Sequence, residues 1–364
     1  MMHADDLLCL AYVGMHPDRR NQLVTARGGV AGVLQGVRDG TVEVPERARR
    51  AALVDPNIRR AELAAIGVRV VIRGDETFPE HLANLPDAPD LLFVRGAIAA
   101  DRGVAVVGSR KATSYGLGLA RAYGAALGSA GWPVISGLAR GIDGAAHEGL
   151  LAAAGRGAAV LGSGVDVWYP PEHRSLGESL LDTGGCLLSE YPPGAPPLGW
   201  RFPPRNRIIS GLAAAVVVVE AAKHGGALIT ARCALEQGRE VLATPGDVTR
   251  STSEGCNLLI RDGAIPVFDP EDLIEAISLI LGPPPLTTRP APTGDRLLDS
   301  LGPVGRTVDS LACTLGLSVS EVLTDIARLE TGGLIAREGG MVVPTRSRRG
   351  APDRGRAHRL ANER

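Results

Sequence analysis

The chain of 364 residues is long enough for two or three domains of ordinary size, and its 45% hydrophobic content provides for a globular core. A net charge of −1 and five scattered cysteines without a CxxC pair argue against a strongly basic protein, a disulfide framework and a zinc ribbon. The first residues lack a basic stretch before an apolar run, and no uncharged run reaches the ~18 residues that span a bilayer, so we expect a cytoplasmic protein without a membrane partner.

Apolar residues recur at helical spacing within residues 1–70, as in DDLLCLAYV and RRAELAAIGV, which predicts a small N-terminal helical domain. From residue 104 the pattern changes to short apolar runs separated by helical stretches. Strands joined by helices form parallel sheets, so residues 71–282 are predicted to form an α/β, Rossmann-like core with a mostly parallel sheet. The predicted strands are residues 104–107, 133–136, 158–161, 186–189, 214–220, 240–243 and 264–268.

The remaining chain has three further segments. Residues 283–294 are rich in proline and are predicted to be a linker. Residues 295–345 have the pattern of three helices followed by a hairpin with a Gly-Gly turn, which predicts a winged-helix-like domain. Residues 346–364 carry seven arginines against one aspartate and one glutamate, which predicts a basic disordered tail.

Ligands bind a parallel sheet at the carboxyl ends of its strands, so the loop after each strand is a candidate site. GSRKATSYG follows the first core strand and offers Ser109 and Arg110 shortly before a helix, whose free amides can hold an anion. The loop lacks the GxGxxG pattern and an acidic ribose ligand, so we expect no dinucleotide and no other cofactor. The plainer alternative is an ordinary turn with a solvated arginine.

A second basic loop, EAAKHGG, follows the strand at 214–220. Its paired glycines, Gly225 and Gly226, let an oxyanion approach the backbone amides, and Lys223 supplies a point charge. The 39 basic residues include only two lysines, Lys111 and Lys223, and both lie in these two loops. This placement favours a binding role, although chance placement in an arginine-rich chain stays open.

SGLARGIDGAAHEG follows the strand at 133–136. Asp143 and His147 share one face of its helix, but a metal would need a third ligand that the sequence does not place, so we expect a structural hydrogen bond between them and no metal site. The candidate binding residues of this loop are Ser136, Gly137, Arg140 and Gly141.

FPPRNRIISGL places Arg205 and Asn206 at the start of another helix, where they form a candidate phosphate contact. An alternative remains open, because Arg205 and Arg207 could equally pair with Glu190 or Glu220.

Eight motifs in this order resemble the core of the DNA processing protein A (DprA, or Smf) family: GSRKATSYG, SGLARGIDGAAHEG, VLGSGVDVWYPPEHRSL, LLSEYPPG, FPPRNRIISGL, EAAKHGGALITA, GREVLATPGD and GCNLLIRDGA. The resemblance extends over residues from about 75 to 280. It implies a homodimeric recombination mediator that binds and protects incoming single-stranded DNA and helps to load the RecA recombinase during natural transformation. It also implies that Arg110 and Lys223 contact the DNA.

One motif departs from the family. Members commonly have Ser-Gly-Ser before LITA, where this chain has Gly225, Gly226 and Ala227. Two hydroxyls are therefore lost, and backbone amides would have to hold a phosphate there.

Two other functions compete. A nucleotide N-glycoside hydrolase of the lysine-decarboxylase-like family has PGGxGTxxE with a catalytic glutamate, but HGGALITA has no carboxylate at that offset and Glu236 comes too late. The loops show no paired carboxylates and no nucleophile with a base, so we predict no catalytic residue and no enzyme. A sequence-specific regulator acting through the winged helix is disfavoured, because Arg328 is the main basic residue of its third helix.

Overall fold

The computed structural model describes residues 4–98, 103–283, 295–301, 306–338 and 341–344. The chain divides into two compact units, here named the core unit (Met1–Thr287) and the C-terminal unit (Thr288–Arg364). In the part of the chain that is described, no helix is long and apolar enough to cross a bilayer.

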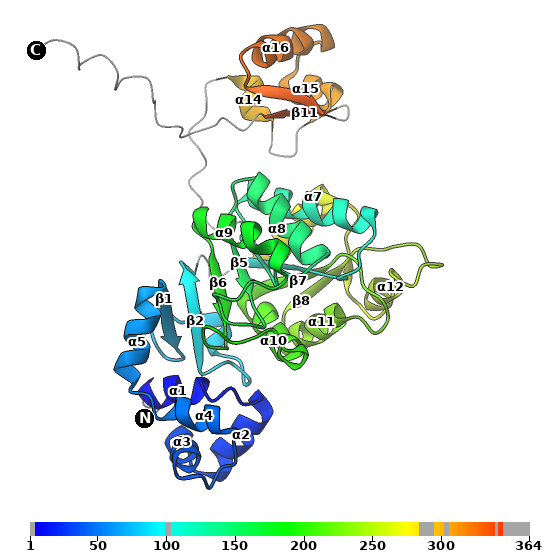
Figure 1. Cartoon of the computed structure of the whole chain (residues 1–364). Helices are drawn as coiled ribbons and strands as arrows, with labels where there is room; N and C mark the ends of the chain where they lie inside the picture. Colours follow the sequence, from blue (N-terminus) through cyan, green and yellow to red (C-terminus); the bar gives the residue numbers. More distant parts are fainter. Residues whose placement is uncertain (1–3, 99–102, 284–294, 302–305, 339–340, 345–364) are drawn as a thin grey trace, which may run out of the picture. The chain divides into compact units, whose positions relative to one another are not determined.

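The core unit begins with five short helices (Figure 1). Proline occupies the first turn of two of them, directly after a capping side chain: His16 before one helix and Asp55 before the other. Leu8 and Val33 are completely buried between the helices, so this segment is helical as predicted. The helices are α1 (Ala4–Ala11), α2 (Pro17–Ala26), α3 (Val30–Asp39), α4 (Glu46–Ala52) and α5 (Pro56–Ala65).

A nine-stranded sheet follows, in the order β1-β2-β6-β5-β4-β3-β7-β8-β9. The pairs from β6 to β9 across this order are all parallel, which confirms the mostly parallel α/β core. All seven predicted strands are present. They are β3 (Gly103–Val107), β4 (Val134–Ser136), β5 (Gly157–Val160), β6 (Cys186–Ser189), β7 (Ala213–Val218), β8 (Glu240–Ala243) and β9 (Ile265–Pro266).

Two antiparallel strands at one edge were not predicted. They are β1 (Val68–Ile72) and β2 (Leu91–Gly96), and the short helix α6 (Glu80–Ala83) lies between them. The predicted boundary at residue 70 falls inside β1, because α5 ends at Ala65. How the chain divides into domains there stays a prediction.

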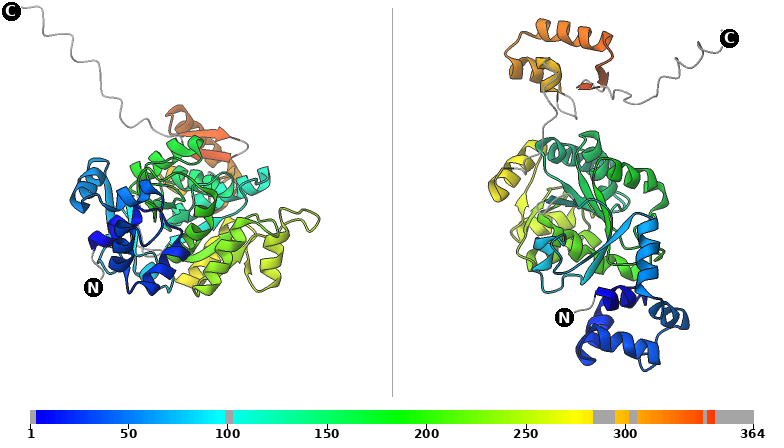
Figure 2. Two further views of the ribbon diagram at one scale, coloured as in Figure 1. Left: turned by 60° about the horizontal axis from the view of Figure 1, so that its bottom comes forward. Right: turned by 90° about the vertical axis from the view of Figure 1, so that its left-hand side faces the viewer.

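Helices cover both faces of the sheet (Figures 1 and 2). Alternate residues of a strand face opposite sides, so Val104 and Val106 pack in one hydrophobic cluster while Ala105 and Val107 pack in the other. The first cluster includes side chains of α7 (Ser114–Ala130), α8 (Ile142–Ala152), α9 (Arg174–Asp182) and α13 (Pro270–Leu281). The second includes side chains of α10 (Phe202–Leu212), α11 (Gly226–Glu236) and α12 (Glu254–Arg261). Two 3-10 turns complete the unit, η1 (Pro171–His173) and η2 (Gly199–Arg201).

The C-terminal unit has the predicted winged-helix order of three helices and two antiparallel strands. The third helix begins with a capping box formed by Ser318 and Glu321. The predicted Gly-Gly turn, nearly all of the linker at 283–294 and the tail at 346–364 lie outside the described residues. The elements are α14 (Arg296–Ser300), α15 (Val308–Leu315), α16 (Val319–Thr331), β10 (Ile335–Glu338) and β11 (Met341–Pro344).

Candidate nucleic-acid interface

Three of the predicted loops meet at the carboxyl edge of the sheet. Strands β3 and β7 are parallel neighbours, with Val107 opposite Val218 at their ends. Just beyond, the amide of Ser109 donates a 2.7 Å hydrogen bond to the carbonyl oxygen of Glu220, and the Ser109 carbonyl accepts one from the amide of Ile142 at 3.2 Å. The loops after β3, β4 and β7 are therefore tied together by their backbones.

Glycine is required at one point of this junction. Gly141 has a φ of +80°, and a Cβ atom there would collide with the carbonyl oxygen of Ser109. The close approach of the β3 and β4 loops thus depends on a residue without a side chain.

Four basic side chains from these loops are exposed: Arg110, Lys111, Arg140 and Lys223. The Arg110 guanidinium lies 4.7 Å from the ring centroid of Phe202, the first residue of α10. An arginine held over an aromatic face keeps its charge while its orientation is restricted. Phe202 was not predicted as part of the site, and its only signal in the sequence is an aromatic residue directly before PPRNR.

Two of the exposed cations are ion-paired. Arg140 pairs with Glu172, and the Lys223 ammonium lies 3.7 Å from the carboxylate of Glu254. The four side chains retain between 47% and 55% of their accessible surface. Exposed pairs of this kind contribute about 0–1 kcal/mol, so a phosphate can displace the carboxylate at little cost.

Glu220 does not neutralise these cations through a direct contact that the structure describes. Its carboxylate accepts a 2.6 Å hydrogen bond from the hydroxyl of Thr113 and a 3.2 Å bond from the Thr113 amide. Thr113 is the N-cap of α7, so the carboxylate lies at the positive end of that helix.

Four other predicted residues form a buried layer beneath the loops: Ser136, Gly137, Arg205 and Asn206. Arg205 donates hydrogen bonds to the carbonyl oxygens of Gly137, at 2.9 Å, and Val160. The Asp143 carboxylate accepts one from the Gly137 amide at 3.0 Å. Burial lowers the pKa of Arg205 to about 10 and raises the pKa of Asp143, while attraction between the two charges opposes both shifts. Arg205 remains a cation at neutral pH and connects the ends of β4 and β5.

Asn206 and Ser136 also point inward. The Asn206 side chain donates a 3.3 Å hydrogen bond to the carbonyl oxygen of Gly226, which fixes the loop after β7. Ser136 is completely buried, and its hydroxyl donates a 2.7 Å bond to the carbonyl oxygen of Val106. Both residues position backbone that borders the loops.

Arg207 follows the alternative that the sequence left open, since it forms a 2.8 Å ion pair with Glu190. Arg20 of α2 reaches the same carboxylate at 3.2 Å. The N-terminal helices are therefore joined to the sheet through a shared acid.

The predicted hydrogen bond between Asp143 and His147 is wrong. Asp143 instead binds the Gly137 amide, because its side chain turns toward the β4 loop. His147 is completely buried, and burial lowers its pKa to about 4. Among the described residues, no three His, Cys, Asp or Glu side chains gather as metal ligands.

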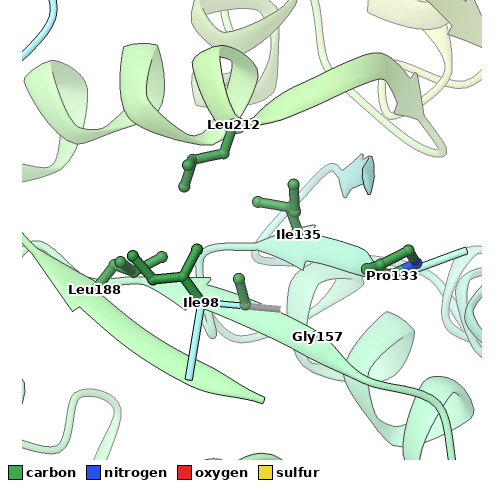
Figure 3. Close-up of a pocket in the computed structure, with 7 residues that line it drawn as sticks. Ile98, Pro133, Ile135, Gly157, Leu188 and Leu212 are labelled. Carbon is green, nitrogen blue, oxygen red and sulfur yellow. The ribbon is translucent and has the colours of Figure 1, made fainter. Parts of the chain in front are cut away.

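A small recess lies at the other end of the sheet, where β4 and β5 begin. Apolar side chains face it, including Ile98, Ile135, Leu188 and Leu212 (Figure 3). Among the described residues, those that line the recess are all uncharged.

Sequence comparisons find known proteins that are similar to this chain over the sheet and the C-terminal unit. A family model described as DNA recombination-mediator protein A matches residues 69–278, and one described as DprA winged helix domain matches residues 282–341. Protein Smf of Escherichia coli (strain K12) is 43% identical over 283 residues, which are 74% of this chain and 76% of that protein. The DNA processing protein DprA of Bacillus subtilis (strain 168) is 37% identical over 58% of this chain and 72% of that protein.

Two solved structures are similar in fold. The X-ray structure of DNA processing protein A from Streptococcus pneumoniae aligns with a TM-score of 0.60 and 32% identity, over 76% of this chain and 98% of that chain. The Helicobacter pylori protein, described for its unique single-stranded DNA binding mode, aligns with a TM-score of 0.51 and 23% identity, over 58% of this chain and 95% of that chain. The second match concerns the fold alone.

Proposed function

The chain belongs to the DNA recombination-mediator protein A family, and we propose that it binds single-stranded DNA along the carboxyl edge of its sheet. One observation carries the proposal. Arg110 and Lys223, both exposed, stand on loops that end the neighbouring parallel strands β3 and β7. Two cations on adjacent loops can contact successive phosphates of one strand.

The two cations suit different roles. Arginine can fork two phosphate oxygens, and the ring of Phe202 beneath Arg110 restricts its guanidinium to one side of the loop. Lysine acts as a point charge, and the α11 amides beside Lys223 add hydrogen-bond donors. Apart from its chain neighbours and its own helix backbone, no atom of the described residues lies within 4 Å of the Cβ position of Gly226, which leaves room for a phosphate despite the missing hydroxyls.

The candidate residues then fall into two groups. Direct contact is assigned to the accessible ones and positioning to the buried ones. The contact group is Ser109, Arg110, Arg140, Gly141, Lys223, Gly225 and Gly226. The positioning group is Ser136, Gly137, Arg205 and Asn206.

The wider role rests on the family resemblance. The chain would act in the cytoplasm as a homodimer, without a cofactor, protecting incoming single strands and helping to load RecA in natural transformation.

The hydrolase alternative is weaker on two counts. Glu236 is the last residue of α11, about 15 Å along the helix from the paired glycines, and it pairs with Arg232 on the surface. The two buried acids beside the loops are also engaged, since Glu220 is bonded to Thr113 and Asp143 to the Gly137 amide. We therefore propose a binding protein without catalysis.

The regulator alternative is also weakened. Arg328 of α16 is paired with Asp295 and Asp325. A side chain held by two carboxylates is a poor reader of base edges in the major groove.

The test compares single-stranded and duplex DNA binding by the full chain across a salt series. We expect tighter binding to the single strand, weakening with salt as counterions are released. Equal or tighter binding to the duplex contradicts the proposal. Release of free base from nucleoside monophosphates, abolished by changing one loop carboxylate, would favour the hydrolase.

A further inference from the structure

A cavity of about 240 Å³ opens beside the proposed DNA-binding edge, at the carboxyl ends of β7 and β8. It is bounded by the start of α7, the end of β7 and the loop from Thr244 to Ser253 that leads into α12. None of its side chains belongs to the proposed phosphate contacts. The residues that define its chemistry are Thr113, Tyr115, Glu220, Thr244, Arg250 and Ser253.

The size of the cavity limits what it can hold. Pockets for drug-sized ligands measure about 300–1,000 Å³, so this one suits a single small ring system. Tyr115 retains 60% of its surface at the cavity, while Glu220 and Thr244 are only 5% and 2% exposed. The cavity therefore combines an accessible aromatic ring with a buried polar wall.

The buried wall presents mainly acceptors. A carboxylate only accepts hydrogen bonds and has room for about four. At Glu220 the Thr113 hydroxyl donates to one oxygen and the Thr113 amide, 3.2 Å from both oxygens, is shared between them, so acceptor capacity remains mainly on the other oxygen. The Thr244 hydroxyl is shared with the phenol of Tyr123 at 3.2 Å. A ligand must bring N–H donors to Glu220, and a phosphate is excluded from that wall by like charge.

Guanine meets this requirement better than the other DNA bases. Its N1–H and N2–H₂ donors lie side by side, so both can point at one carboxylate. In adenine and cytosine an acceptor nitrogen lies next to the amino group, and in thymine two carbonyl oxygens flank the single N–H. Those acceptors would face the negative charge of Glu220.

The position of the cavity connects it to the DNA path. Glu220 precedes Lys223 by three residues, and Ser253 directly precedes Glu254, whose carboxylate lies 3.7 Å from the Lys223 ammonium. A nucleotide whose phosphate binds Lys223 can thus direct its base toward the cavity. Arg250, paired with Asp247 at 3.7 Å, lies at the same loop and can face the base carbonyl.

We propose that this cavity receives one unstacked guanine of the bound single strand, with Glu220 accepting from its Watson–Crick edge and Tyr115 stacking on its face. The inference rests on the proposed binding of single-stranded DNA. Base stacking on aromatic rings and readout of an extruded base by its Watson–Crick edge are general modes of recognition.

The test measures binding of the full chain to an oligothymidylate and to the same oligomer carrying one guanine. We expect the guanine oligomer to bind roughly five- to tenfold tighter, as hydrogen bonds to a charged acceptor allow. Glu220→Gln places an amide where the acceptor stood, and Tyr115→Ala removes the ring, so both should bring the ratio of the two affinities close to one. The ratio cancels any common effect on phosphate contacts. Glu236→Gln on the exposed end of α11 is the matched control and should keep the wild-type ratio.

The outcomes separate the two proposals. Failure to bind either oligomer overturns the proposed function. Equal wild-type affinities, or a ratio unchanged in Tyr115→Ala, overturn the guanine site while leaving strand binding intact. If Glu220→Gln unfolds, Tyr115→Ala alone decides, because its side chain is mostly exposed. Free dGMP is the third probe. Loss of the guanine advantage on its addition supports the site, whereas tight dGMP binding that leaves the oligomer ratio unchanged assigns the cavity to free nucleotides and overturns the strand-base assignment.

Discussion

The guanidinium of Arg205 donates a 2.9 Å hydrogen bond to the carbonyl oxygen of Gly137, and both residues are buried. The same side chain binds the Val160 carbonyl, and its charge faces Asp143. An arginine that the sequence offers as a phosphate ligand therefore joins the loops after β4 and β5. Removing this side chain should therefore lower the stability of the fold, and any effect on DNA binding should follow from that.

Arg205→Ala is expected to lower the free energy of unfolding by about 3–5 kcal/mol, because Asp143 would keep a buried charge without its partner. Urea unfolding followed by circular dichroism measures the change. Arg121→Ala is the control, since Arg121 forms an exposed ion pair with Glu148 and should cost no more than about 1 kcal/mol. A variant at Arg205 that unfolds like the wild type yet loses DNA would assign it to the contact group instead.

His147 predicts a dependence of stability on pH. Burial lowers its pKa to about 4 from 6.5, so between these values the unfolded chain binds a proton that the folded chain does not. Stability must therefore fall as the pH drops through this window, by roughly 3 kcal/mol in total. His147→Leu should flatten the plot of unfolding free energy against pH from 6.5 to 4, whereas His224→Leu on the exposed β7 loop should leave it unchanged. Identical slopes for wild type and His147→Leu would contradict the assignment.

The sequence predicted the parallel strands well because their signal is strong. Strand β7, with its run of alanines and valines, is buried on both faces of the sheet and lies between helices. A short, continuous apolar run between helical segments is typical of a parallel strand. The antiparallel strands gave a weaker signal. Strand β1 has the sequence VRVVI, in which buried and exposed residues do not alternate regularly. It also follows closely after helix α5, so the sequence pattern did not distinguish it from the end of that helix.

The site was predicted at the level of loops but not of side chains. Parallel topology brings the carboxyl ends of β3 and β7 together, so Arg110 and Lys223 could be placed on one edge from their positions alone. Whether an arginine points out or in depends on contacts between distant residues. The bonds from Arg205 to Gly137 and from Thr113 to Glu220 join residues 68 and 107 positions apart, and sequence spacing does not encode them.

Deleting residues 290–364 should leave a folded core that still binds single-stranded DNA. The buried residues of the two hydrophobic clusters on the faces of the sheet end at Ile277. The C-terminal unit has a separate cluster whose buried residues begin at Leu297, so the described hydrophobic cores of the two units share no residue. A single cooperative thermal melt together with retained binding is the expected result. Loss of folding, or of nearly all affinity, would show that the boundary or the site is misplaced. Deleting only residues 346–364 separates the effect of the arginine-rich tail.

Arg110→Ala is expected to weaken single-stranded DNA binding without lowering the melting temperature, because its guanidinium is exposed and stacks on Phe202. Loss of one phosphate contact should lower the slope of log affinity against log salt by about 0.7. Lys111→Ala is the matched control. Lys111 has the same charge and is also exposed, but the proposal assigns it no contact, so its substitution should matter less. Equal losses in both variants would indicate a diffuse field rather than a defined contact.

Lys223 and Glu254 form an ion pair that, under the proposed function, DNA would have to open. Their 3.7 Å ion pair is half-exposed, so in the free protein the carboxylate competes with a phosphate for the same ammonium. Lys223→Ala should weaken binding and lower the salt slope by about 0.7, as for Arg110. Glu254→Gln should act in the opposite direction and tighten binding about two- to fivefold at low salt, with the gain fading as salt screens the competing charge.

The double variant decides whether this gain depends on the lysine. If Glu254 acts by occupying Lys223, removing the acid after the lysine is gone should bring little further change, so Lys223→Ala with Glu254→Gln should bind like Lys223→Ala alone. A strongly non-additive double-mutant cycle is the expected signature of two residues in contact. Additive effects would mean that Glu254 repels the DNA directly. Lys223 and Glu254 would then affect DNA binding independently of each other. Thermal melts of all three variants should agree within a few degrees, because an exposed pair contributes at most about 1 kcal/mol to stability.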